Sequence, residues 1–254
     1  MKTPVLFVGH GSPMNITLDN EFTGSLKELG KTLPKPKAIG IFSAHWQTQG
    51  IKVHCADRAK QIYDFFGFPD ELYQVTYNPA GASAYGKKAA ELMGGKCDSS
   101  WGNDHAAWSV LMHMYPEADI PVFYISSDMA AEYQTLLETS AKLKPLREDG
   151  VLFIGSGNIV HNLRNADFYN MDAKPLPRAS EFDTAIKGAI MSGLSSRICD
   201  IAQYGECAKF AVPTRDHYIP FIMACGLRDK NDRVSFPCEI FQNASISMRS
   251  VMFS

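Results

Sequence analysis

Short apolar runs alternate along the chain with longer stretches that mix apolar and polar positions. The runs are nearly continuous in apolar character, which predicts strands covered on both faces at residues 4–9, 38–43, 51–55, 121–126, 151–156 and 208–212. The stretches between them predict helices at residues 20–33, 80–93, 109–114, 129–144, 178–192 and 195–201. Strands that alternate with helices indicate an α/β fold with a central, mostly parallel sheet flanked by helices.

Two segments interrupt this alternation. Residues 66–82 combine prolines with several aromatic side chains, and residues 162–177 form a polar connection. Long ordered loops in compact proteins are often functional, so we expect the first segment to contribute to a binding site. The sequence contains no internal repeat and no low-complexity tract. We therefore expect a single catalytic domain over residues 1–254, with its site at the C-terminal ends of the strands.

Composition narrows the choice of function. The formal net charge is −2, from 25 basic and 27 acidic residues, and no stretch is strongly basic, which argues against nucleic-acid binding. No apolar run reaches the length of a membrane span, and the N-terminus runs directly into a strand without a signal-peptide pattern. None of the six cysteines forms a CxxC pair. We expect a cytoplasmic protein with free thiols, either a monomer or a small homo-oligomer.

Histidines stand at the ends of two predicted strands. The run Val5-Leu6-Phe7-Val8-Gly9 ends at His10, and the run Ala38-Ile39-Gly40-Ile41-Phe42-Ser43-Ala44 ends at His45. Ligands of open α/β sheets bind beyond the carboxyl ends of the strands. We therefore expect the two imidazoles to meet at one point, where they can share a metal.

Three further histidines lie beside turn-forming residues. His105 stands where a turn enters a predicted helix, and His217 directly follows an aspartate. His161 follows a strand and the turn Gly155-Ser156-Gly157, and we expect it in the first turn of a helix. Two or three imidazoles with an open position make a catalytic zinc or iron site, and a further histidine can act as acid or base. His54 and His113 lie within apolar runs and are expected to be structural.

Weaker motifs are open to more than one interpretation. The segment Gly155-Ser156-Gly157-Asn158 could cradle a phosphate, but it lacks the P-loop lysine, and a turn that positions His161 explains it better. Ser12 follows a glycine without forming a nucleophile elbow, which favours a turn or cap residue. Trp46 and Trp108 are of a type that usually packs in cores, but each stands close to a candidate histidine and could line an aromatic pocket.

Taken together, these motifs resemble the class III extradiol ring-cleaving dioxygenases, and within them the small single-chain 4,5-DOPA dioxygenase type. The blocks that carry the resemblance occur in the expected order over nearly the whole chain. They are Gly9-His10-Gly11-Ser12-Pro13, Ser43-Ala44-His45-Trp46, Phe66-Gly67-Phe68-Pro69, Asp104-His105 with Trp108-Ser109, Gly155-Ser156-Gly157-Asn158-Ile159-Val160-His161-Asn162-Leu163, Asp216-His217-Tyr218 with Pro220, and residues 245–251.

The resemblance implies one mononuclear non-haem metal per chain. His10 and His45 match two metal ligands of the family, and His217 stands where some relatives have a glutamate ligand. His161 matches a catalytic base that can also close the metal shell, and His105 matches a catalytic histidine near the dioxygen and the substrate. Fe(II) is expected for activity, and the all-histidine set also suits Zn(II).

The implied reaction opens the ring of a catechol-type, DOPA-like substrate with O₂. We expect the substrate to contact Trp46, Trp108 and Ser12. Two alternatives remain on the sequence alone: a zinc-dependent hydrolase that uses the same histidines, and a non-catalytic binding protein on the same fold. The sequence has no His-Glu-x-x-His motif, which excludes a zincin.

Overall fold

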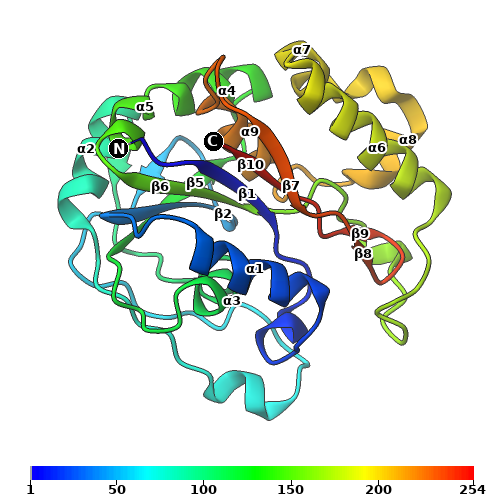
Figure 1. Cartoon of the computed structure of the whole chain (residues 1–254), viewed down its shortest axis with the longest axis horizontal. Coiled ribbons are helices and arrows are strands. Elements are labelled where there is room, and N and C mark those ends of the chain that lie inside the picture. The colour runs from blue at the N-terminus through cyan, green and yellow to red at the C-terminus, as the bar shows by residue number, and fades with distance from the viewer. Residues whose placement is uncertain (1) are drawn as a thin grey trace.

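An eight-stranded sheet with helices on both faces forms the centre of the computed structural model, which describes residues 2–254 (Figure 1). The strand order is β4-β3-β5-β2-β6-β1-β10-β7, and β5, β2, β6 and β1 run parallel. The strands are β1 Val5–Gly9, β2 Ala38–Thr48, β3 Lys52–Val53, β4 Lys96–Cys97, β5 Val122–Asp128, β6 Val151–Gly157, β7 Val234–Cys238 and β10 Ser250–Phe253, with β8 Phe241–Gln242 and β9 Ile246–Ser247 in a separate hairpin. This architecture confirms the predicted fold class.

Nine α-helices surround the sheet within residues 2–254. They are α1 Glu21–Thr32, α2 Ser83–Met93, α3 His105–Met114, α4 Tyr133–Ala141, α5 Lys144–Glu148, α6 Pro177–Ser192, α7 Ser195–Cys199, α8 Gly205–Ala211 and α9 Ile219–Gly226. Short 3₁₀ helices cover Pro13–Ile16, Asp70–Gln74, Leu163–Asn165 and Ile201–Tyr204. None of the helices in this part of the chain combines the length and hydropathy that a membrane crossing requires.

Alternation along the strands divides the core into two layers. In β1, Val5 and Phe7 pack with α4 and α9 on one face, while Leu6 and Val8 pack with α1 and α3 on the other. Both faces of the strand are therefore buried, which explains its continuous apolar sequence.

One predicted strand is wrong. Residues 208–212 belong largely to helix α8, in which Cys207, Ala208 and Ala211 are buried. These positions are spaced as on one face of a helix, and a short apolar run does not distinguish a buried strand from a buried helix. The segment 129–144 contains α4 and the start of α5 rather than one helix, and α9 and the C-terminal strands were not predicted.

The expectation of free thiols is also wrong for two cysteines. Cys55 and Cys97 form a disulfide across 42 residues of sequence. Strands β3 and β4 pair in parallel with Val53 opposite Cys97, and Cys55 follows two residues after Val53. This pairing brings the two cysteines together, with their Cα atoms 5.5 Å apart. The other four cysteines are free.

Candidate active site

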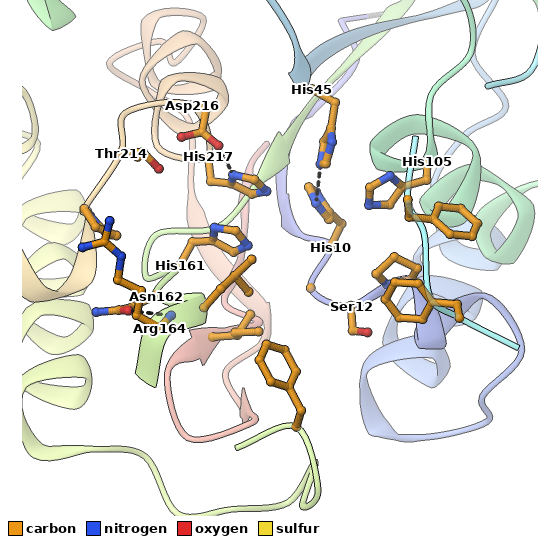
Figure 2. Close-up of a pocket in the computed structure, with 18 of the residues that line it drawn as sticks. His10, Ser12, His45, His105, His161, Asn162, Arg164, Thr214, Asp216 and His217 are labelled. Carbon is orange, nitrogen blue, oxygen red and sulfur yellow. Dashed lines mark hydrogen bonds and ion pairs between the residues drawn. The ribbon is translucent and has the colours of Figure 1, made fainter. Parts of the chain in front are cut away.

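A pocket of about 670 Å³ opens at the C-terminal ends of β1, β2 and β6. Five histidines line it, from three strand ends and two helix starts, together with an aromatic wall (Figure 2). These five are the residues that the sequence singled out: His10, His45, His105, His161 and His217. The position of the pocket is the one expected for an open α/β sheet.

His10 directly follows β1 and is held from both sides. Its backbone N–H donates to the Gly157 carbonyl at 3.0 Å, and its Nδ1 lies 3.0 Å from the Ser156 hydroxyl. That hydroxyl donates to the Ala106 carbonyl at 2.6 Å, so it accepts a hydrogen bond from the Nδ1–H of His10. The Nε2 atom of His10 then carries the lone pair, as a metal ligand requires.

A bulge in β2 directs His45 into the pocket. Phe42 pairs with Ile125 and Gln47 with Ser127, so residues 43–46 of β2 face a single residue of β5. Bulges re-aim side chains at the ends of strands, often beside active sites. His45 Nε2 consequently lies 3.3 Å from His10 Nε2.

His217 reaches the same point from the start of α9. Its carbonyl accepts the Asn158 N–H at 2.9 Å, and a Cβ at Gly157 would meet that carbonyl oxygen at only 2.2 Å. Glycine is therefore required at position 157 for this close approach. The Asp216 carboxylate lies 2.5 Å from His217 Nδ1 and leaves Nε2 free to face the pocket.

One carboxylate orients two of the histidines. Asp64 presents one oxygen to His45 Nδ1 and the other to His105 Nδ1, each at 2.9 Å. Asp104 caps the helix that begins at His105 and also accepts from the Ser43 hydroxyl at 2.6 Å. Asp64 was not among the predicted site residues; its signal in the sequence is a single carboxylate within an aromatic segment shortly before the loop at residues 66–82.

His161 lies in the pocket, but it does not occupy the predicted helix. Gly155 to Gly157 belong to β6, and His161 pairs in an isolated bridge with Ile246. Its ring stacks on that of His217 with centroids 3.5 Å apart. Because the glycine segment is strand and not a helix start, it forms no phosphate cradle.

Burial keeps most of these imidazoles neutral. It lowers the pKa of His10 and His161 well below the ordinary value, and the neighbouring histidines act in the same direction. Burial also lowers the pKa of His105 and His217 against the opposing effect of Asp64 and Asp216. For His45 burial is outweighed by Asp64 and two other carboxylates, so its pKa is raised.

The residues present fit a mononuclear metal. Two imidazole nitrogens about 2.1 Å from one ion at a tetrahedral angle are about 3.4 Å apart, and the His10 and His45 Nε2 atoms are 3.3 Å apart. Ring centroids of His10, His45 and His217 are separated by 5.2–5.3 Å, as three rings around one centre require. The ring of His105 is less regularly placed, at 4.2 Å from His45 and 5.5 Å from His10. Ligand atoms of His10, His45 and His105 all lie within 4.8 Å of one another, and His217 forms a second such group with His161 and Asp216.

Of the three residues expected to contact the substrate, one lines the pocket. Ser12 lines the pocket and caps the turn at Pro13–Ile16, as its sequence context suggested. Trp46 and Trp108 do not line it, which corrects that expectation. Both are buried in the core layer beneath α1 and α3, and the Trp108 indole donates to the Ile62 carbonyl. The aromatic wall consists instead of Phe65, Phe66, Phe68 and Phe168.

Five imidazoles that meet in one pocket, at the carboxyl ends of a mostly parallel sheet, place the molecule in the class of α/β proteins with a histidine-lined site. The family model described as the catalytic LigB subunit of aromatic ring-opening dioxygenase matches residues 4–254, and the chain belongs to this family. It is an extradiol ring-cleaving dioxygenase, which confirms the resemblance found in the sequence.

Several known proteins are similar over nearly their full length. The 4,5-DOPA dioxygenase extradiol of Escherichia coli (strain K12) is 37% identical over 98% of this chain and 94% of its own. The protein of the same name from Mirabilis jalapa is 33% identical, over 89% and 87%. A crystal structure of an uncharacterized protein from Escherichia coli K12 superposes with a TM-score of 0.86 at 33% identity and covers both chains completely.

Proposed function

We propose that this enzyme uses O₂ to open the aromatic ring of a catechol-type, DOPA-like substrate at a metal held by His10, His45 and His217. The observation that carries the proposal is the regular triangle of these three rings, each with Nδ1 engaged and Nε2 directed inward. The names of the relatives support the substrate class, since several are described as 4,5-DOPA dioxygenases.

Bound Fe(II) would supply the redox chemistry with O₂ and favour the phenolate form of the catechol. Zn(II) suits the same three imidazoles and can occupy them as a bound metal. Neutral imidazoles are needed for either ion, and the lowered pKa values of His10 and His217 keep their lone pairs available near neutral pH. The pKa of His45 is raised by Asp64, so metal binding there would release any proton that the ring carries.

His161 is suited to remove a proton from a catechol hydroxyl. Within residues 2–254, its ring nitrogens have no hydrogen-bond partner, and its lowered pKa leaves the imidazole neutral. A neutral, unengaged imidazole at the pocket wall can accept a proton at one ring nitrogen and return it later. Its stacking on His217 fixes the ring next to the proposed metal centre.

His105 is suited to stabilise negative charge on an oxygen of the substrate. Its ring borders those of His10 and His45, and the Asp64 carboxylate lies beside its Nδ1. Asp64 favours the protonated form of this imidazole when a negative charge develops nearby. Ser12 lies at the pocket wall, where its hydroxyl can contact the bound substrate.

Anaerobic loading with Fe(II), followed by a catechol and air, is expected to produce a yellow ring-opened product, with no product under argon. His161→Ala should lower turnover about 10²–10⁴-fold. His113→Gln is the control, because His113 bonds the Asn15 carbonyl outside the pocket.

Full turnover in His161→Ala would show that the base assignment is wrong. Equal activity in air and argon, with zinc as the active metal, would instead identify a hydrolase.

A further inference from the structure

Arg164 is the one lysine or arginine in the pocket lining among residues 2–254. Its side chain is exposed, and within that range the guanidinium has no hydrogen-bond or ion-pair partner. It lies on the same wall as His161 and Thr214 (Figure 2). A guanidinium that is left unpaired at the wall of a cavity is available to a ligand.

The backbone that carries Arg164 is fixed. The Asn162 side-chain oxygen accepts the Arg164 N–H at 3.1 Å and caps the 3₁₀ helix Leu163–Asn165. Asn162 is itself anchored, because its amide donates to the Phe210 carbonyl at 2.7 Å and its backbone N–H donates to Ser245. The base of the arginine is therefore held in place while its head remains free.

The other charged groups nearby are already engaged. Arg215, two residues before His217, donates to the carbonyls of Met129 and Ala131 and stacks on the Tyr133 ring. Asp216 also lines the pocket, but its carboxylate is bound to His217. Unlike Arg215 and Asp216, Arg164 therefore carries a charged group that is free to bind a ligand.

We propose that Arg164 binds a carboxylate on the side chain of the substrate, so that the enzyme selects catechols with an anionic substituent over neutral or cationic ones. The inference rests on the proposed function for the catechol itself. A diol placed at the histidines directs its substituent along a pocket of about 670 Å³, a size typical of small-ligand sites. Arginine binds carboxylates through two parallel N–H···O bonds, which suits this role.

Binding of non-cleavable ligands tests the proposal without turnover. Three monophenols share a 4-hydroxyphenylethyl skeleton and end in an anionic, a neutral or a cationic group: 3-(4-hydroxyphenyl)propionate, its primary amide, and 4-hydroxyphenethylamine. Calorimetry on the zinc-loaded protein should give about tenfold tighter binding of the acid than of the amide, the size of one charge-assisted hydrogen bond. The amine should bind most weakly, because it is repelled by the guanidinium.

Arg164→Gln should remove the preference for the acid, and Arg164→Lys should restore part of it. Arg178→Gln removes the same charge from an exposed position outside the pocket lining and should leave the preference unchanged. Failure of the wild type to prefer the acid, or failure of all three ligands to bind, would overturn the proposal. So would a preference that persists in Arg164→Gln.

Turnover separates this inference from the proposed function. Cleavage of 4-methylcatechol and 3-(3,4-dihydroxyphenyl)propionate tests the reaction, and Arg164→Gln should raise KM only for the acid. Suppose that neither catechol is cleaved but Arg164→Gln still abolishes the preference for the acid in binding. Carboxylate recognition by Arg164 is then supported, and the proposed reaction is wrong. If both catechols are cleaved and Arg164→Gln does not change the preference for the acid, the proposed reaction is supported and the proposed role of Arg164 is wrong.

Discussion

Each of the three proposed metal ligands has one ring nitrogen engaged by a different partner. Ser156 holds His10, Asp64 holds His45 and Asp216 holds His217, in each case at Nδ1. Such partners fix the orientation of the ring and increase the basicity of the other nitrogen. The Nε2 atoms are therefore arranged to bind an ion before any ion arrives.

The third ligand can be identified by measuring metal content. We expect His217→Ala to lose most of its bound metal after Fe(II) loading and desalting, because one corner of the regular triangle is removed. His105→Ala should retain nearly one metal per chain but turn over more slowly, since His105 is proposed to act on the substrate. Elemental analysis and single-turnover kinetics on the same samples measure both effects.

The opposite result, metal retained in His217→Ala and lost in His105→Ala, would make His105 the third ligand. His54→Ala is the control for the loss of a buried imidazole, because His54 lies outside the pocket lining.

At the level of the elements, the strand ends were the predictable part of the site. Apolar runs identified β1, β2 and β6, and parallel strands bring their carboxyl ends together, so His10, His45 and the segment leading to His161 could be placed in one region. The pairing between distant segments was not predictable. The bulge around His45 and the bridge between His161 and Ile246 depend on residues far away in sequence.

The same limit explains the errors about the tryptophans. Closeness in sequence to a site histidine suggested that Trp46 and Trp108 face the substrate, but each side chain points into the core layer beneath α1 and α3. Which face a side chain occupies depends on the local register, and the bulge in β2 changes that register next to Trp46.

The contact between β6 and α9 gives a prediction at this scale. Gly157→Ala would place a Cβ 2.2 Å from the His217 carbonyl oxygen, so we expect a loss of about 1–3 kcal/mol in unfolding free energy and weaker metal binding. Denaturant unfolding and metal titration measure the two effects.

Gly24→Ala in α1 is the matched control. Its Cβ would meet nothing within 4 Å, so helix propensity should stabilise this variant by about 0.5–1 kcal/mol. The explanation of Gly157 is wrong if both variants unfold alike and both bind metal as the wild type does.

At the level of the whole molecule, one buried arginine joins distant parts of the chain. Arg147 is almost fully buried and donates to the carbonyls of Thr3, Leu227 and Phe253. It also pairs with the buried Asp232 carboxylate at 2.6 Å. Segments near both ends of the sequence are therefore attached to the same side chain, and Val5 at the start of β1 pairs with Phe253 at the end of β10 (Figure 1).

Acid should weaken this junction. Burial acts to raise the pKa of Asp232, but Arg147 and the other donors outweigh it and lower the pKa to about 2. A carboxyl whose pKa is lower in the folded state contributes stability above its unfolded pKa near 4, and this contribution disappears as the pH falls through about 2. Asp232→Asn should lose roughly 3 kcal/mol of unfolding free energy near neutral pH. As the pH falls from about 4 to about 2, the stability of this variant should decrease less steeply than that of the wild type.

Unfolding curves at several pH values measure the difference between variant and wild type. Asp119→Asn, which removes an exposed ion pair with Lys35, should change stability by less than about 1 kcal/mol at any pH. A variant at position 232 that is as stable as the wild type at neutral pH would contradict this account of the junction.

The position of β1 has a consequence for protein synthesis. This strand lies between β6 and β10, and β10 occupies Ser250–Phe253, far later in the sequence. Until residues 250–253 have been translated, the strand that leads to His10 lacks the neighbour that completes its hydrogen bonding. We therefore expect the histidine triangle to form only after β10 has been synthesised and has paired with β1.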